Sequence, residues 1–209
     1  GRVFGFFSGY YPVGSNIYRH TISSTGSSAD SGFDLSSGRG YSMGLSNSTR
    51  GIICAGNNPS NPNGTNIIDY HSIPIGGNAV DFGNLTNATL LPVTCASSVR
   101  GICAGGQFSP NYYANIDYIT ISTTGDAQDF GDLSTGRSQF ACGFSNATRG
   151  ILGGGITGPA PTTPINTTEF ITIASTGNAQ DFGDLSRTNS RNCASACSST
   201  RGVFAGGDP

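Results

Sequence analysis

The chain has 209 residues, a formal net charge of -2 and only 11% charged residues. Its ten basic residues are all Arg and form no stripe that would neutralise a nucleic-acid backbone, and no apolar run approaches the ~20 residues of a membrane span. We therefore expect no nucleic-acid partner and no membrane span. The 32 Gly residues and abundant Ser, Thr and Asn disfavour helices, whereas short clusters of Val, Ile, Phe and Tyr favour strands, so the composition predicts an all-β fold.

The first predicted strand is GRVFGFFSG at residues 1–9, and we expect Arg2 to open it in the manner of the later Arg-Gly strands. A loop separates it from a second strand, NIYRHTI, which begins at Asn16. A Ser-Thr-Gly turn at Ser24 leads to a third strand, and a less regular fourth strand, YSMGLSNST, precedes Arg50. The rest of the chain repeats this order of four short strands.

Arg-Gly pairs recur about every fifty residues, and each pair opens an apolar strand that ends in small residues. The pairs are Arg50-Gly51, Arg100-Gly101, Arg149-Gly150 and Arg201-Gly202. The repeat divides one domain, 1–209, into units of approximately 1–49, 50–99, 100–148 and 149–200, with the start of a fifth at 201–209. Because one copy of the Arg-Gly strand is left over, we expect an open or incomplete array whose terminal strands meet neighbouring material.

The tripeptide Asp-Phe-Gly occurs at Asp81, Asp129 and Asp181. In protein kinases the Asp of this tripeptide holds Mg²⁺, but one active site needs only one such loop. Three copies at the repeat spacing therefore predict a structural segment, the outer strand of each unit. We expect its Phe to pack between units and its Gly to let the chain bend.

The repeat resembles the kelch repeat, in which an apolar strand ends in Gly-Gly and a Tyr-bearing strand follows a variable loop. The matching residues are Gly105-Gly106, Gly154-Gly155, Gly206-Gly207, Tyr70 and Tyr118, and Phe82, Phe130 and Phe182 replace the usual outer-strand Trp. The sequence of the repeat is similar to that of kelch-like repeat proteins of bacteriophages and aquatic microbes. This resemblance implies a β-propeller-like array of about four four-stranded blades.

We call residues at the same position of successive units a column. Two columns of titratable residues are candidate chemical sites. His20 and His71 share a column but lie in neighbouring units without a third ligand, so we expect strand residues rather than a metal site. Asp69, Asp117 and Glu169 share another column. We expect them to pair with Arg50, Arg100 and Arg149 or to face water, with a cation site or channel as the alternative. No unique catalytic set emerges, so we expect no enzyme, no cofactor and no metal.

The six Cys residues occupy positions where other units carry small or apolar residues. Cys54 stands in the column of Ala104, and Cys103 stands in the column of Ile53. Cys193 and Cys197 lie four apart on one strand, too far apart to bridge to each other easily. We therefore expect free, buried thiols.

Six Asn residues fit the acceptor pattern for N-glycosylation. They are Asn47, Asn63, Asn84, Asn87, Asn146 and Asn166. The loops between the first two strands of each unit vary most, and they carry the paired aromatics Tyr10-Tyr11 and Tyr112-Tyr113. Variable loops on a repeated scaffold predict a ligand or partner surface at these four tyrosines, with ordinary loop drift as the alternative.

The expected function is a non-enzymatic structural or adhesive module of a virion appendage or extracellular filament. Its expected partners are copies of itself or other assembly subunits, through the terminal strands, together with surface glycans. The expected location is extracellular or in the virion. The alternative is a carbohydrate-binding or sugar-oxidising kelch-like propeller, while an intracellular kelch adaptor is disfavoured because no helical partner domain is present.

Overall fold

The computed structural model describes residues 4–8, 13–138, 142–158, 161–189 and 191–208. Every regular element in these ranges is a β-strand, so the all-β expectation is confirmed. No helix capable of crossing a membrane is found in the described part of the chain. The strands form several small antiparallel sheets, none of which is closed.

Three sheets contain a full set of four successive strand positions, which we call a, b, c and d in chain order. The second sheet contains β4 (Met43–Ser46), β5 (Arg50–Cys54), β6 (Thr65–Ser72) and β7 (Val80–Thr89). The third contains β8 (Val93–Ala96), β9 (Arg100–Ala104), β12 (Asn115–Thr120) and β13 (Gln128–Asp132). The fourth contains β14 (Cys142–Ser145), β15 (Arg149–Gly153), β17 (Thr163–Thr172) and β18 (Gln180–Asn189), with the short β16 (Ile156–Thr157) paired to β17.

The first and last sheets hold only part of this set. The first contains β1 (Phe4–Ser8), β2 (Gly14–Thr21) and β3 (Ala29–Arg39), at positions b, c and d. The last contains β19 (Arg191–Cys197) and β20 (Gly202–Asp208), at positions a and b. A two-stranded hairpin, β10 (Gln107–Phe108) and β11 (Asn111–Tyr112), lies in the loop between β9 and β12.

The register of the first sheet corrects one sequence expectation. Gly5 lies opposite His20, just as Gly51 lies opposite His71 in the second sheet. Gly5 is therefore the counterpart of Gly51, and Phe4 occupies the position that Arg holds in the later units. The expectation that Arg2 opens this strand in the manner of an Arg-Gly pair is wrong.

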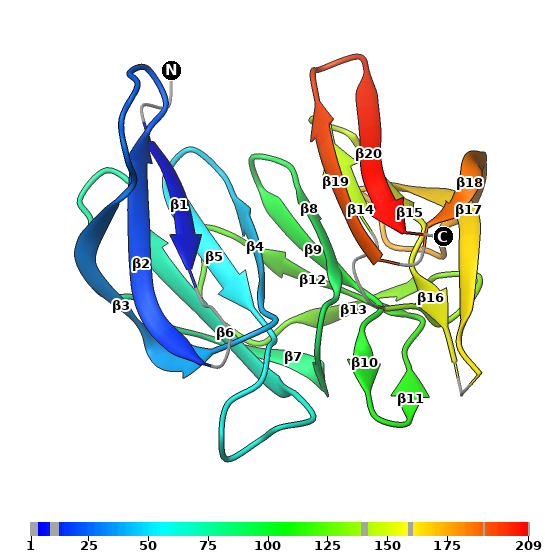
Figure 1. Cartoon of the computed structure of the whole chain (residues 1–209), viewed down its shortest axis with the longest axis horizontal. Coiled ribbons are helices and arrows are strands. Elements are labelled where there is room, and N and C mark those ends of the chain that lie inside the picture. Colours follow the sequence, from blue (N-terminus) through cyan, green and yellow to red (C-terminus); the bar gives the residue numbers. More distant parts are fainter. Residues whose placement is uncertain (1–3, 9–12, 139–141, 159–160, 190, 209) are drawn as a thin grey trace.

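The sheets follow one another along an open curve from the N-terminal sheet to the C-terminal one (Figure 1). Successive a strands contact each other, and side-chain hydroxyls join them. The Oγ1 of Thr94 donates to the carbonyl of Gly44 at 2.9 Å, and the Oγ of Ser195 donates to the carbonyl of Gly143 at 2.8 Å. These bonds connect the third sheet with the second and the last sheet with the fourth.

The apolar core lies at the junctions between sheets. The junction of the second and third sheets buries Ile52, Cys54, Ala55, Ile68, Phe82, Leu85, Cys103, Ile119, Ile121 and Ala127. The glycines of the Arg-Gly pairs allow close approach here: a Cβ on Gly101 would lie 2.7 Å from Leu45 Cδ1, and one on Gly150 would lie 2.6 Å from Cys95 Sγ. Each Gly therefore accepts a side chain from the a strand of the preceding sheet.

The Asp-Phe-Gly segments lie in the d strands, where they bind the turn of the next unit. The amide of Gly177 donates to the carbonyl of Phe130 at 2.7 Å, and the amide of Ala179 donates to the carbonyl of Asp132 at 2.8 Å. Phe130 is 2% exposed. Phe182, in contrast, is 53% exposed, so the expectation that every such Phe packs between units is wrong for this copy.

Candidate functional site

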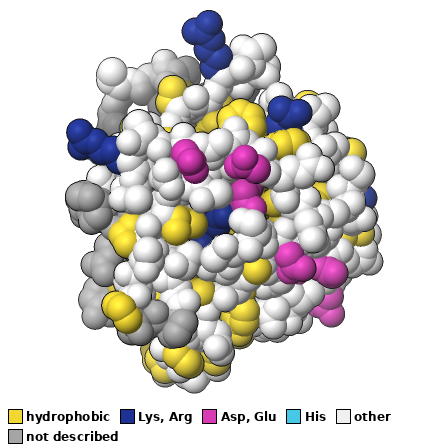
Figure 2. Space-filling model, turned by 90° about the vertical axis from the view of Figure 1, so that its right-hand side faces the viewer, with side chains coloured by type: hydrophobic (Ala, Val, Ile, Leu, Met, Phe, Trp, Pro, Cys, Tyr) yellow, Lys and Arg dark blue, Asp and Glu magenta, His cyan; other side chains and the backbone are white. Residues whose placement is uncertain are grey.

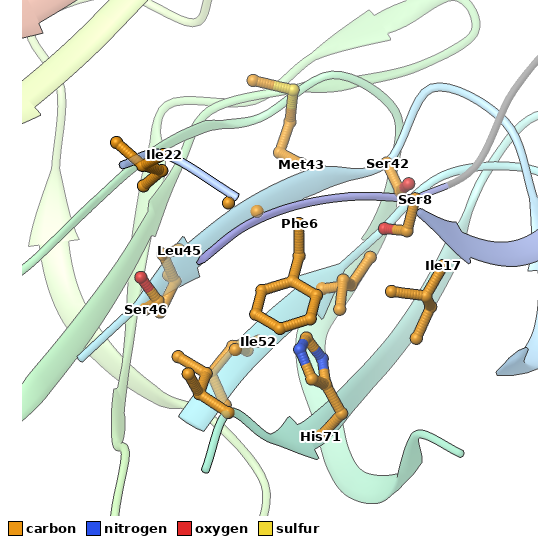
Figure 3. Close-up of a pocket in the computed structure, with 15 residues that line it drawn as sticks. Phe6, Ser8, Ile17, Ile22, Ser42, Met43, Leu45, Ser46, Ile52 and His71 are labelled. Carbon is orange, nitrogen blue, oxygen red and sulfur yellow. The ribbon is translucent and has the colours of Figure 1, made fainter. Parts of the chain in front are cut away.

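A cavity opens between the first and second sheets. It has a volume of about 500 Å³ and is lined mainly by apolar side chains, with His71 at its base (Figure 3). The first sheet has no a strand in the described chain. At the later junctions the side chains of Leu45, Cys95 and Phe144 from the a strands cover the Arg-Gly glycines. The cavity lies beside Gly51, in the space that an a-strand side chain fills at the later junctions.

His71 fills part of this space. Its imidazole packs over Gly51, where a Cβ would lie 3.0 Å from Nε2. Its ring meets the Phe6 ring edge-to-face, with centroids 4.8 Å apart (Figure 3). The residue is 3% exposed, and neither ring nitrogen has a hydrogen-bond partner among the described residues. Burial lowers the pKa of His71, so the neutral imidazole is the favoured form.

The histidine column does not form a cluster of ligands. His71 is buried, whereas His20 on β2 is partly exposed. No group of three or more His, Cys, Asp or Glu side chains arranged to hold a metal is found among the described residues. The chemistry available at His71 is that of a neutral, buried hydrogen-bonding group in an apolar wall.

The acidic column is buried rather than exposed. Asp69 forms an ion pair with Arg39 at 3.0 Å, and Glu169 forms one with Arg137. All four side chains are almost fully buried. Burial lowers the pKa of both guanidinium groups, and the partner carboxylate opposes that shift. The expected pairing with Arg50, Arg100 and Arg149 is therefore wrong, as is the expectation that these carboxylates face water.

The arginines of the Arg-Gly pairs stack on aromatic rings instead. Arg50 lies 4.4 Å from the Tyr70 ring centroid, and Arg100 lies 4.5 Å from that of Tyr118. Their Nη1 atoms donate to the next unit, to the carbonyls of Ile121 (2.8 Å) and Ile173 (3.0 Å). The arginine position thus joins neighbouring units through a cation–π contact and a backbone hydrogen bond.

The third unit carries a buried carboxylate without an arginine. Thr89 ends β7 opposite Thr65, as Arg39 ends β3 opposite Gly14, so Thr89 stands in the arginine column. Asp117 instead accepts from the amide and hydroxyl of Thr86, at 2.9 and 2.7 Å. Burial raises the pKa of Asp117, and its hydrogen bonds oppose that shift.

Sequence reasoning missed the partners Arg39 and Arg137. A signal was present, because the phrase Leu-Ser-x-Gly-Arg occurs at residues 35–39 and again at residues 133–137. The second and fourth units do not repeat this phrase, so the fifty-residue period does not reveal it. The two buried ion pairs therefore depend on arginines that occur only in the first and third units.

Two of the four tyrosines proposed for binding are described. Tyr112 and Tyr113 are both half-buried, and β10–β11 lies on the lower edge in Figure 1 near the start of β17. The Tyr112 ring packs against Gly158, in the loop of the next unit, closely enough to leave no room for a Cβ there. Tyr10 and Tyr11 lie outside the described residues. Of the two described tyrosines, Tyr112 therefore packs between two loops of the protein itself.

The acceptor asparagines are not equally available. Asn47 is buried; its Oδ1 accepts from the amides of Thr49 (2.8 Å) and Arg50 (2.9 Å), and its Nδ2 donates to the carbonyl of Ser98 at 3.0 Å. This residue closes the a–b turn and ties it to the next unit, so a glycan on Nδ2 is incompatible with the packing. Asn146 makes the same contacts, with its Nδ2 bonded to Ser199 at 3.2 Å, although its side chain is exposed.

The cysteines divide into free and bonded residues. Cys54, Cys95 and Cys103 are free and buried, as expected, while Cys197 is free and exposed. Cys142 is disulfide-bonded, so the expectation of a free thiol is wrong for it. Cys193 is placed by its backbone in β19.

No protein-family model matches the chain, and no curated protein matches it. Figure 2 shows one face on which acidic side chains gather in two groups among mostly uncharged surface.

Proposed function

We propose that the protein is a non-catalytic, propeller-type repeat module that builds a virion appendage or extracellular filament by joining strands at its open ends. One observation carries the proposal. In the described chain β1 hydrogen-bonds only to β2, and β20 hydrogen-bonds only to β19, so both terminal sheets expose an edge. Unpaired edges bind other strands readily.

Apolar side chains at the C-terminal end support this proposal. Val203 on β20 is 59% exposed and Phe182 on β18 is 53% exposed. In the preceding sheets the corresponding Ile102 and Phe130 are 0% and 2% exposed, because another sheet covers them. Burying these side chains against a further sheet would stabilise an assembly by the usual hydrophobic effect. The contact is of the head-to-tail type, which propagates unless its rotation closes a ring.

The buried polar groups support a structural role rather than catalysis. The carboxylates of Asp69 and Glu169 are bonded to buried arginines, and that of Asp117 is bonded to Thr86. Among the described residues that line the cavity, His71 has no second titratable side chain to act with it. Catalytic sites need such a partner within hydrogen-bond reach.

Deletion of residues 201–209 tests the proposal. The truncated chain should lose assembly in light scattering and electron microscopy while its far-ultraviolet circular dichroism still shows strand. Val203→Lys should raise the concentration needed for assembly about tenfold or more, since it places a charge on an edge strand. Val80→Lys is the matched control, because Val80 is 55% exposed on an interior sheet. Normal assembly of the truncated chain, or an equal effect of both substitutions, would contradict the proposal.

A further inference from the structure

Two free cysteines of neighbouring sheets lie side by side in the core. Cys54 ends β5 and Cys103 lies in β9, both at the b position. Their Sγ atoms are 2.9 Å apart, and their side chains are 0% and 7% exposed. A disulfide has an S–S bond of about 2.05 Å, so a small shift would bring these sulfurs within bonding distance.

The repeat shows that packing does not require this pair. At the next junction the equivalent positions hold Ala104, which is 0% exposed, and Leu152, which is 0% exposed. An ordinary apolar pair therefore fills the same space between the third and fourth sheets. The two thiols meet at one junction only, and they bring reactivity that an Ala–Leu pair lacks.

A second observation concerns the oxidation state of the cysteines. Cys142 is disulfide-bonded, so this protein already carries an oxidised cysteine in another sheet. The thiol of Cys103 is a poor nucleophile once folded, because its contact with Cys54 and then its burial raise its pKa. Reaction is therefore favoured while the two sheets are still coming together.

We propose that Cys54 and Cys103 form a disulfide that links the second and third sheets. The oxidant is a small-molecule disulfide such as oxidised glutathione. One cysteine thiolate attacks it, forming a mixed disulfide and releasing one glutathione thiolate. The second cysteine thiolate attacks the protein sulfur of that mixed disulfide and releases the other. The two cysteine thiols lose two electrons and two protons in total, and oxidised glutathione takes them up to become two molecules of reduced glutathione.

The test uses the full chain with Cys197→Ser, which removes the exposed free thiol. The protein is unfolded in urea without reductant, which keeps the disulfide of Cys142, and is refolded with oxidised and reduced glutathione. Of the three thiols of Cys54, Cys95 and Cys103, we expect one to remain on denaturing titration. Refolding under argon without glutathione should leave all three.

Peptide mapping identifies the bond. Trypsin cleaves after Arg100 and Arg137, so the disulfide should join peptides 51–100 and 101–137. Because Cys95 lies in the first of these peptides, the mapping is done in a Cys95→Ala background, where the linked pair should persist. Cys54→Ala, made with Cys95 retained, is the matched variant, since Ala104 fills the equivalent position, and it should abolish the link between the two peptides. Three thiols after glutathione refolding, or a link that survives Cys54→Ala, would overturn the proposal.

Discussion

Individual residues of the repeat have different roles in different units. The column with Ile119 and Ile171 holds His71 in the second unit, and the described part of the first sheet supplies no a strand at that junction. The imidazole then fills space that the other junctions fill with two apolar side chains. The carboxylate column differs in the same way, since Asp69 and Glu169 have buried arginines and Asp117 has none. Residues of one column therefore have different partners in different units.

His71 should make the stability of the protein depend on pH. Because burial lowers the folded-state pKa, the unfolded chain binds the proton more readily. The free energy of unfolding should therefore fall as the pH drops below the ordinary value of 6.5 and continue to fall down to the folded-state pKa. Melting temperatures between pH 7.5 and 5 measure this decline.

The matched variants are His71→Ile and His20→Ile. The first introduces the residue of the Ile119 and Ile171 column and should flatten the decline, while the second leaves His71 in place and should preserve it. Burial raises the pKa of Asp117, which acts in the opposite direction as the pH falls. Asp117 is present in both variants, so the difference between them isolates the contribution of His71. An unchanged decline in His71→Ile would assign the pH effect to other groups.

At the scale of elements, the d strands of the second and third units each accept backbone hydrogen bonds from the turn between the c and d strands of the following unit. Gly131 has a φ of 141°, and a Cβ there would lie 2.6 Å from the backbone of Gly177. Gly183 has a φ of 123°, but nothing lies within 4 Å of a Cβ at that position. The two glycines share the positive φ and differ in the neighbouring turn.

Gly183→Ala should reduce the free energy of unfolding by about 1 kcal/mol, because only the positive φ opposes the substitution. Gly131→Ala should cost about 1–3 kcal/mol more, because the methyl group also displaces the turn at Gly177. Urea unfolding of the two variants gives the difference directly. Equal losses would show that the turn adds nothing to the requirement for Gly.

The strands and their repeat could be predicted from the sequence, because Arg-Gly, Ser-Thr-Gly and Asp-Phe-Gly each mark one strand or turn. The partners of buried charges could not, since Arg39 and Arg137 are brought to Asp69 and Glu169 by side-chain packing, which periodicity does not encode. The exposure of Phe182 could not be predicted either, because it depends on the absence of a covering turn rather than on its own segment.

At the scale of the whole molecule, the sheets form an array in which each contacts its neighbours. Stability in such an array is a sum of unit and junction contributions, so the middle sheets are protected from both sides and the terminal sheets from one. The apolar clusters follow this rule: the junctions around the third sheet bury more residues than the junction of the first and second sheets.

Hydrogen exchange should therefore show a gradient along the chain and locate the assembly contact. In the unassembled protein the amides of β9 should exchange slowest and those of β1 and β20 fastest, because local opening begins where fewest groups are buried. On assembly, protection should rise at least about tenfold at β1 and β20 and hardly change at β9, because only edge strands gain hydrogen bonds. The loop containing Tyr112 and Tyr113 is the internal comparison. If protection rises there and the terminal strands stay unchanged, partners are held by the variable loops, and the strand-joining function is wrong.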